Sequence, residues 1–88
     1  MSQINVLPGA NFIIALGAMI MLGEKLKNLR NDKDLTQEQV AKYLGLTRGA
    51  YAGYELGRRD PDKQTLLKLA RFYGVSVDFL IDDSIKKP

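Results

Sequence analysis

From residue 22 onward, apolar residues recur at the spacing of amphipathic helices. Leu22, Leu26 and Leu29 stand at positions i, i+4 and i+7, which predicts a first helix that ends near residues 31–34. Similar spacing in later segments predicts further helices that begin near residues 36, 47, 62 and 76. No segment shows the period of two that a β-strand requires. The pattern therefore predicts an all-α fold, a compact five-helix domain over residues 24–81.

Capping residues and glycines predict where these helices begin and end. Thr36 and Gln39 match the S/T-x-x-E/Q capping box of a helix N-terminus. Gly45 ends that helix because it adopts a left-handed conformation without a steric clash, and Thr47 is placed to cap the third helix. Two short helices joined by such a tight turn form a helix-turn-helix unit, in which the second helix can enter the DNA major groove. Further ends and starts are predicted at Gly57, Asp62, Gly74 and Ser76.

The third helix, residues 47–55, has two faces of different chemistry. At about 100° per residue, one face consists of Ala50, Tyr51 and Tyr54, and we expect it to lie in the core because these rings are the helix's only large apolar groups. The opposite face, expected to point outward, consists of Arg48, Gly49, Ala52 and Gly53. Each glycine costs about 1 kcal/mol relative to alanine in a helix interior. Two interpretations stay open: a ligand approaches the backbone closely at these glycines, or tertiary packing holds a weak helix.

Residues 1–23 differ from the rest of the chain because they contain no charged side chain. Their apolar run, residues 12–22, is about half as long as a membrane-spanning helix must be, and no positive charge precedes it as in a secretory signal. A membrane segment is therefore not expected. Two interpretations remain: an apolar arm that packs on the domain or on a second subunit, or extra sequence ahead of the true start, at Met19 or Met21. The predicted organisation is an arm or extension at 1–23, the domain at 24–81 and a tail at 82–88.

Composition narrows the class of function. The chain has no cysteine, so disulfides and thiolate metal sites are excluded, which fits a reducing cytoplasm. It also has no histidine, so the commonest general base and the commonest metal ligand are missing. An enzyme is therefore not expected, and neither is a metal or other cofactor. The net charge of +3 is only mildly basic, which permits a polyanionic partner without establishing one.

Residues 24–81 resemble the lambda-repressor and Cro type of helix-turn-helix proteins, a family with many small bacterial and phage regulators. The matching strings are LxxLR at 26–30, LTQEQVA at 35–41, LGLTR at 44–48, YExGRRxP at 54–61, LLKLA at 66–70 and GVS at 74–76. The resemblance covers about two-thirds of the chain, and the strings follow one another at the family's spacing, which makes it specific. It implies a transcriptional regulator, expected to be a repressor, whose partner is double-stranded DNA.

The resemblance also implies DNA-contacting positions on and around the third helix. Gln37, at the start of the second helix, corresponds to a phosphate-contacting position. Arg58 and Arg59 are expected to hold the DNA backbone. Many relatives carry longer polar side chains on the groove-facing side, so direct readout is expected to narrow to Arg48 on a guanine and the Ala52 methyl, with DNA shape supplying further specificity. The predicted DNA-binding residues are Gln37, Thr47, Arg48, Gly49, Ala52, Gly53, Arg58 and Arg59.

Two more features follow from the resemblance. In this family an ion pair at the positions of Arg30 and Glu55 ties the first helix to the third, and we assign that role to them. The expected assembly is a homodimer on an inverted repeat, whose two recognition helices lie about 34 Å apart. Two interfaces stay open: the apolar arm, or Leu67, Phe72 and Phe79 outside the main apolar stripes. A second class of function also stays open, a protein-interaction module such as an antitoxin or assembly factor with the same fold.

Overall fold

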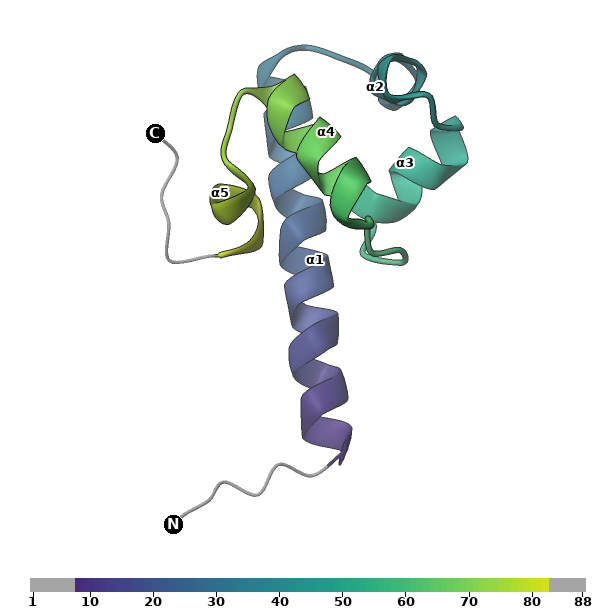
Figure 1. The fold of residues 1–88 in the computed structure, drawn as a ribbon. Helices are drawn as coiled ribbons and strands as arrows, with labels where there is room; N and C mark the ends of the chain where they lie inside the picture. Colours follow the sequence, from purple (N-terminus) through teal and green to yellow (C-terminus); the bar gives the residue numbers. More distant parts are fainter. Residues whose placement is uncertain (1–7, 83–88) are drawn as a thin grey trace.

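The computed structural model describes residues 8–82, with side chains from residue 17 onward, and its described part contains five helices and no strand (Figure 1). The predicted all-α fold is confirmed. α1 packs against α3 and α5, α2 packs against α3 and α4, and α4 packs against α5. The helices are α1 (Pro8–Asp32), α2 (Gln37–Leu44), α3 (Arg48–Glu55), α4 (Lys63–Tyr73) and α5 (Val77–Ile81).

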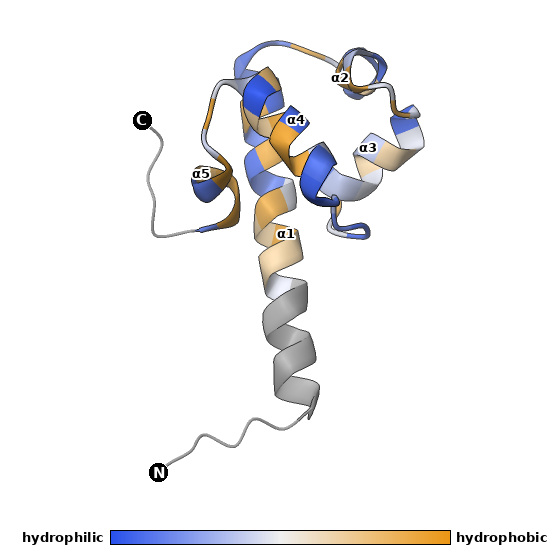
Figure 2. Cartoon of the chain, viewed as in Figure 1, coloured by the Kyte–Doolittle hydropathy of each residue, from blue (hydrophilic) through white to orange (hydrophobic). Residues whose placement is uncertain are grey.

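One hydrophobic core joins all five helices. Its most deeply buried large side chains come one from each helix, in chain order Leu26, Val40, Tyr51, Leu69 and Leu80. Burial of a side chain of this size contributes about 1.5–3 kcal/mol to folding. Hydrophobic residues lie on α4, on α5 and along the described part of α1 (Figure 2), and α1 and α4 each pack against α5. The core therefore fixes the position of α3 from the inside of the domain.

The predicted helix ends are present. Thr36 caps α2 in a complete capping box, in which its hydroxyl accepts from the Gln39 N–H at 3.1 Å and the Gln39 side chain accepts from the Thr36 N–H at 2.8 Å. Gly45 ends α2 in the left-handed conformation, with φ of 72°. Gly74 ends α4 in the same way, with φ of 69°. The predicted N-caps of the later helices, which accept from the backbone three residues on, are Thr47, Asp62 and Ser76.

α1 begins at Pro8, so the change of composition at residue 24 falls inside one continuous helix. Proline is tolerated at a first helical position because that position has no intrahelical N–H partner. Leu22 is buried in the core, and Gly23 is buried where α1 crosses the end of α3. A Cβ at Gly23 would lie 2.7 Å from the Tyr54 carbonyl oxygen. The last residues of the predicted arm, Leu22 and Gly23, are therefore part of the core, so the boundary that the composition suggests at residue 24 is not a boundary of the folded domain.

Toward its N-terminus α1 extends away from the other helices (Figure 1). Ile20 and Met21, directly before the buried Leu22, are exposed, at 44% and 46% of their surface. Within the described residues, no helix combines the length and the hydropathy needed to cross a bilayer. Residues 1–7 of the predicted arm and residues 83–88 of the predicted tail lie outside the described part of the chain.

Phe79 is a core residue, so its predicted place on an outer surface is wrong. It is 8% exposed, because the Ser76 cap starts α5 directly after α4 and turns its apolar side onto α1. The Lys25 ammonium lies 5.0 Å from the centre of the Phe79 ring and donates to the Phe79 carbonyl at 2.6 Å. Phe72 is half-buried, and Leu67 is exposed on α4 as predicted.

Candidate nucleic-acid interface

The tyrosine face of α3 lies in the core. Tyr51 is fully buried, and Tyr54 is 7% exposed, which confirms the predicted orientation of the helix. The Tyr51 hydroxyl hydrogen-bonds the Tyr73 hydroxyl of α4 at 2.6 Å. Burial raises the pKa of Tyr51 well above its ordinary value and that of Tyr73 to about 12, so both phenols are neutral at neutral pH. α3 is thus held from the inside, and its rotation about its own axis is fixed.

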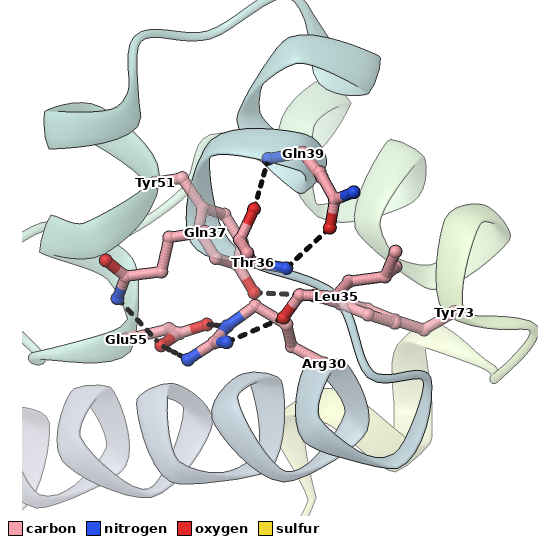
Figure 3. Close-up of polar contacts among 8 residues, drawn as sticks. All are labelled: Arg30, Leu35, Thr36, Gln37, Gln39, Tyr51, Glu55 and Tyr73. Carbon is pink, nitrogen blue, oxygen red and sulfur yellow. Dashed lines mark hydrogen bonds and ion pairs between the residues drawn. The ribbon is translucent and has the colours of Figure 1, made fainter.

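Arg30 and Glu55 form the ion pair that the family resemblance implies (Figure 3). Arg30 Nε donates to Glu55 Oε2 at 2.6 Å, and Nη2 donates to Oε1 at 3.0 Å. A third guanidinium nitrogen, Nη1, donates to the Leu35 carbonyl at 2.8 Å. The hydrogen bond to Glu55 raises the pKa of Arg30 against the opposing effect of burial. The pair therefore joins α1, the turn after it and the end of α3.

Gln37, the first residue of α2, is anchored to the same carboxylate. Its Nε2 donates to Glu55 Oε1 at 3.0 Å (Figure 3). Burial raises the pKa of Glu55, but the hydrogen bonds from Arg30, Gln37 and Tyr51 and the charge of Arg30 together lower it more, so it lies below the ordinary value of 4.5. The ionised carboxylate thus fixes the amide of Gln37 at the edge of the outward face of α3. A network that stabilises the fold also orients a predicted DNA contact.

The outward face of α3 borders a groove with a volume of about 500 Å³. All of the predicted DNA-binding residues except Thr47 line it. Thr47 instead acts as the N-cap of α3, where its hydroxyl accepts from the Ala50 N–H at 3.1 Å. Leu56 also lines the groove, at 61% exposure, and was not predicted. Its position four residues after Ala52, one helical turn on, is a signal in the sequence that places it on this face.

Gly53 is buried, so its predicted exposure on the outward face is wrong. The side chain of Arg59 covers it: a Cβ at Gly53 would lie 2.9 Å from Arg59 Cδ and 3.1 Å from Cγ. Gly49, one turn earlier on the same face, is exposed and has nothing within 4 Å of its ideal Cβ position. The two glycines of α3 therefore meet different surroundings, although helical spacing places them together.

The groove is positively charged. Arg48, Arg58 and Arg59 are exposed along it, and no carboxylate lines it. Within residues 17–82 none of these arginines forms an ion pair with an acidic side chain. The same part of the chain contains no cluster of acidic residues that could hold a metal ion. The uncompensated guanidinium groups make this face suited to a polyanion, because Arg presents paired donors to phosphate and to guanine.

Two short helices with a tight turn between them and an open second helix define a helix-turn-helix protein. The Helix-turn-helix family model matches residues 26–80, more than half of the chain. The chain therefore belongs to the helix-turn-helix family of lambda-repressor and Cro type.

Curated relatives from phages and prophages are similar to most of this segment. An uncharacterised helix-turn-helix-type transcriptional regulator of Bacillus subtilis, the SPbeta prophage-derived YonR, is 48% identical over 61 residues, which are 69% of this chain and 56% of that protein. The cryptic phage CTXphi transcriptional repressor RstR of Vibrio cholerae is 42% identical over 64 residues, 73% of this chain and 58% of that protein. The chain thus spans about half the length of these relatives.

Solved structures match the fold. The restriction-modification controller protein C.AhdI from Aeromonas hydrophila superposes with a TM-score of 0.68 and 33% identity, covering 73% of this chain and 97% of that one. The DNA-binding domain of BldD from S. venezulae gives a TM-score of 0.65 and 31% identity, covering 74% of this chain and 97% of that one. The matching part of this chain therefore accounts for nearly the whole of each of these two solved chains.

Proposed function

We propose that this chain is a sequence-specific transcriptional regulator that binds double-stranded DNA by placing α3 in the major groove. The observation that carries the proposal is the division of α3 into two faces. Tyr51 and Tyr54 fix one face in the core, while the other borders a groove whose arginines have no acidic partner among the described residues. The names of the relatives, a transcriptional regulator, a transcriptional repressor and a DNA-binding domain, support the same function.

We assign a role to each part of the groove. α3 has eight residues and is therefore about 12 Å long, comparable with the width of the major groove. Arg48 stands in its first turn, where a guanidinium can pair with the O6 and N7 acceptors of guanine. Ala52 follows one turn later and offers a methyl contact to thymine. Arg58 and Arg59 lie beyond the C-terminus of α3 and hold phosphates of the flanking backbone.

The regulator acts as a homodimer on an inverted repeat, and the surface between α1 and α5 supports this arrangement. Ala18, Met19, Leu22 and Ile81 line an apolar groove of about 300 Å³ on it, together with Asp60, and Ile81 is 59% exposed. An exposed apolar surface of this kind is typical of an interface. A dimer that covers its operator acts as a repressor by excluding other proteins from it. The relative RstR is named a transcriptional repressor, which supports this role.

The variants Ile81→Asp and Leu67→Asp distinguish the surface between α1 and α5 from the α4 surface predicted from the sequence, because both side chains are exposed and lie on different helices. Light scattering after size exclusion should show a dimer for the parent and for Leu67→Asp, and a monomer for Ile81→Asp. A monomeric Leu67→Asp beside a dimeric Ile81→Asp would move the interface to α4. A monomeric parent would contradict the homodimer altogether.

DNA binding is tested by titrating generic duplex DNA at several salt concentrations with the parent and two triple variants. One variant carries Arg48→Ala, Arg58→Ala and Arg59→Ala. The matched control carries Lys33→Ala, Lys68→Ala and Arg71→Ala, which removes the same charge from exposed positions outside the groove.

The parent should bind at low salt and weaken steeply as salt rises, because phosphate contacts release counterions. The groove variant should lose most of its affinity, and its log–log salt slope should fall by about two to three, while the control stays close to the parent. No binding by the parent at low salt would contradict DNA binding and favour a protein-interaction module. Equal losses in both variants would contradict binding through the groove beside α3.

A further inference from the structure

The side-chain stem of Arg59 packs against Gly53 of α3, in a space that is open because glycine has no Cβ. Its Cδ, Cγ and Cβ would lie 2.9, 3.1 and 3.7 Å from a Cβ placed on Gly53. Real Cβ atoms essentially never approach a carbon at 2.9 Å, so any larger residue at position 53 would displace the Arg59 stem. Gly49 shows that this is not a general property of the face, since its ideal Cβ has nothing within 4 Å.

The backbone anchors Arg59 to the same residue. α3 ends at Glu55, and Gly57 reverses the chain in the left-handed conformation with φ of 73°. The N–H groups of Arg58 and Arg59 then both donate to the Gly53 carbonyl oxygen, at 2.9 and 3.3 Å. Both the main chain and the side-chain stem of Arg59 are therefore held against one residue of α3.

We propose that Gly53 is a positioning residue for DNA binding, which acts through Arg59 and does not itself face the DNA. The missing Cβ seats the Arg59 stem across α3 and holds its guanidinium in the groove that Arg48 also lines. A side chain that is already held in place loses less rotamer freedom when it binds a phosphate. Preorganisation of one long side chain therefore raises affinity by a factor of about two to ten. This inference rests on the proposed function, and it deepens it by assigning the reason for one of the two helix glycines.

A double-mutant cycle with Gly53→Ala, Arg59→Ala and the combined variant tests the proposal on duplex DNA. Gly53→Ala should weaken binding by about two- to tenfold. Arg59→Ala should weaken it at least as much and reduce the salt slope by about one. The combined variant should bind like Arg59→Ala alone, because the residue at position 53 can no longer position a side chain that has been removed.

Two controls separate positioning from misfolding and from charge. Urea unfolding should show the combined variant at least as stable as Arg59→Ala, since alanine is the better helix former once the space is empty. Combining Gly53→Ala with Arg71→Ala, which removes an arginine outside the groove, should retain the full loss from Gly53→Ala.

Equal affinity of Gly53→Ala and the parent would overturn the proposal. So would losses that multiply in the variant combining Gly53→Ala with Arg59→Ala, because independent effects mean that Gly53 does not act through Arg59. In either case a parent that still binds DNA with steep salt dependence leaves the proposed function standing. A parent that binds no DNA at low salt removes both.

Discussion

Replacement of Arg30 by alanine should cost about 3 kcal/mol of the free energy of unfolding. The guanidinium donates two hydrogen bonds to Glu55 and one to the Leu35 carbonyl. Glu55 has only 3% of its side chain exposed, so loss of Arg30 leaves a buried carboxylate that water solvates poorly. Breaking such a pair costs about 3–5 kcal/mol, and we expect the lower end because the Arg30 side chain is 13% exposed and its space opens to solvent. Against a total stability of about 5–15 kcal/mol, this is a large fraction.

Urea unfolding followed by far-ultraviolet circular dichroism measures this loss at neutral pH. The midpoint should fall and the m-value should stay constant, because the variant buries nearly the same surface. Arg71→Ala is the matched control, since Arg71 is exposed and forms no ion pair with the described residues, and it should change stability by less than about 0.5 kcal/mol. A loss below about 1 kcal/mol for Arg30→Ala would show that the pair behaves like a surface ion pair and would refute the reasoning.

A second variant distinguishes the loss of the attraction between Arg30 and Glu55 from the cost of leaving the Glu55 carboxylate unpaired. Replacing Arg30 and Glu55 together by methionine removes both charges, and buried pairs exchanged for apolar side chains of similar volume are often neutral in stability. The double variant should therefore unfold at a higher urea concentration than Arg30→Ala. If it is less stable than Arg30→Ala, the cost lies in packing and not in an unpaired carboxylate.

Three further predictions concern the same region. The folded-state pKa of Glu55 lies below 4.5, so its contribution to stability is complete above that pH and should be lost as the pH falls through the lower folded-state value. Urea midpoints measured from about pH 6 to pH 3 should therefore fall less steeply in Glu55→Gln than in the parent. Gly49→Ala should raise the free energy of unfolding by up to about 1 kcal/mol, since its Cβ enters open space, and a lowered urea midpoint would contradict this. Gly23→Ala should destabilise the fold by about 1–3 kcal/mol, because the new Cβ would lie 2.7 Å from the Tyr54 carbonyl oxygen, a backbone atom that cannot move without shifting α3. A melting temperature equal to that of the parent would rule out a tight crossing of α1 and α3.

Local rules predicted the helix ends and the inner face of α3. Thr36 and Gly45 act through bonds to residues at most four positions away, so their roles can be read from the sequence. The surroundings of Gly53 and Phe79 could not be read in this way. They depend on where the chain returns after α3 and after α4, which is decided by tertiary packing. The start of α1 was missed for another reason: composition changes at residue 24, but nothing after Pro8 breaks the helix.

Glu55 links the stability of the fold to the geometry of the proposed DNA-binding groove. Its Oε1 accepts from both Arg30 Nη2 and Gln37 Nε2 at 3.0 Å, and Gln37 lines the groove beside α3. The other carboxylate oxygen, Oε2, accepts from Arg30 Nε, whereas an amide at position 55 would place one oxygen and one NH₂ donor group opposite these three donors. The charge on Glu55 therefore serves two purposes that share one atom: it holds α1 against α3, and it sets the orientation of an amide at the groove. We therefore expect Glu55→Gln to weaken DNA binding as well as to destabilise the fold, even though the Glu55 side chain is buried.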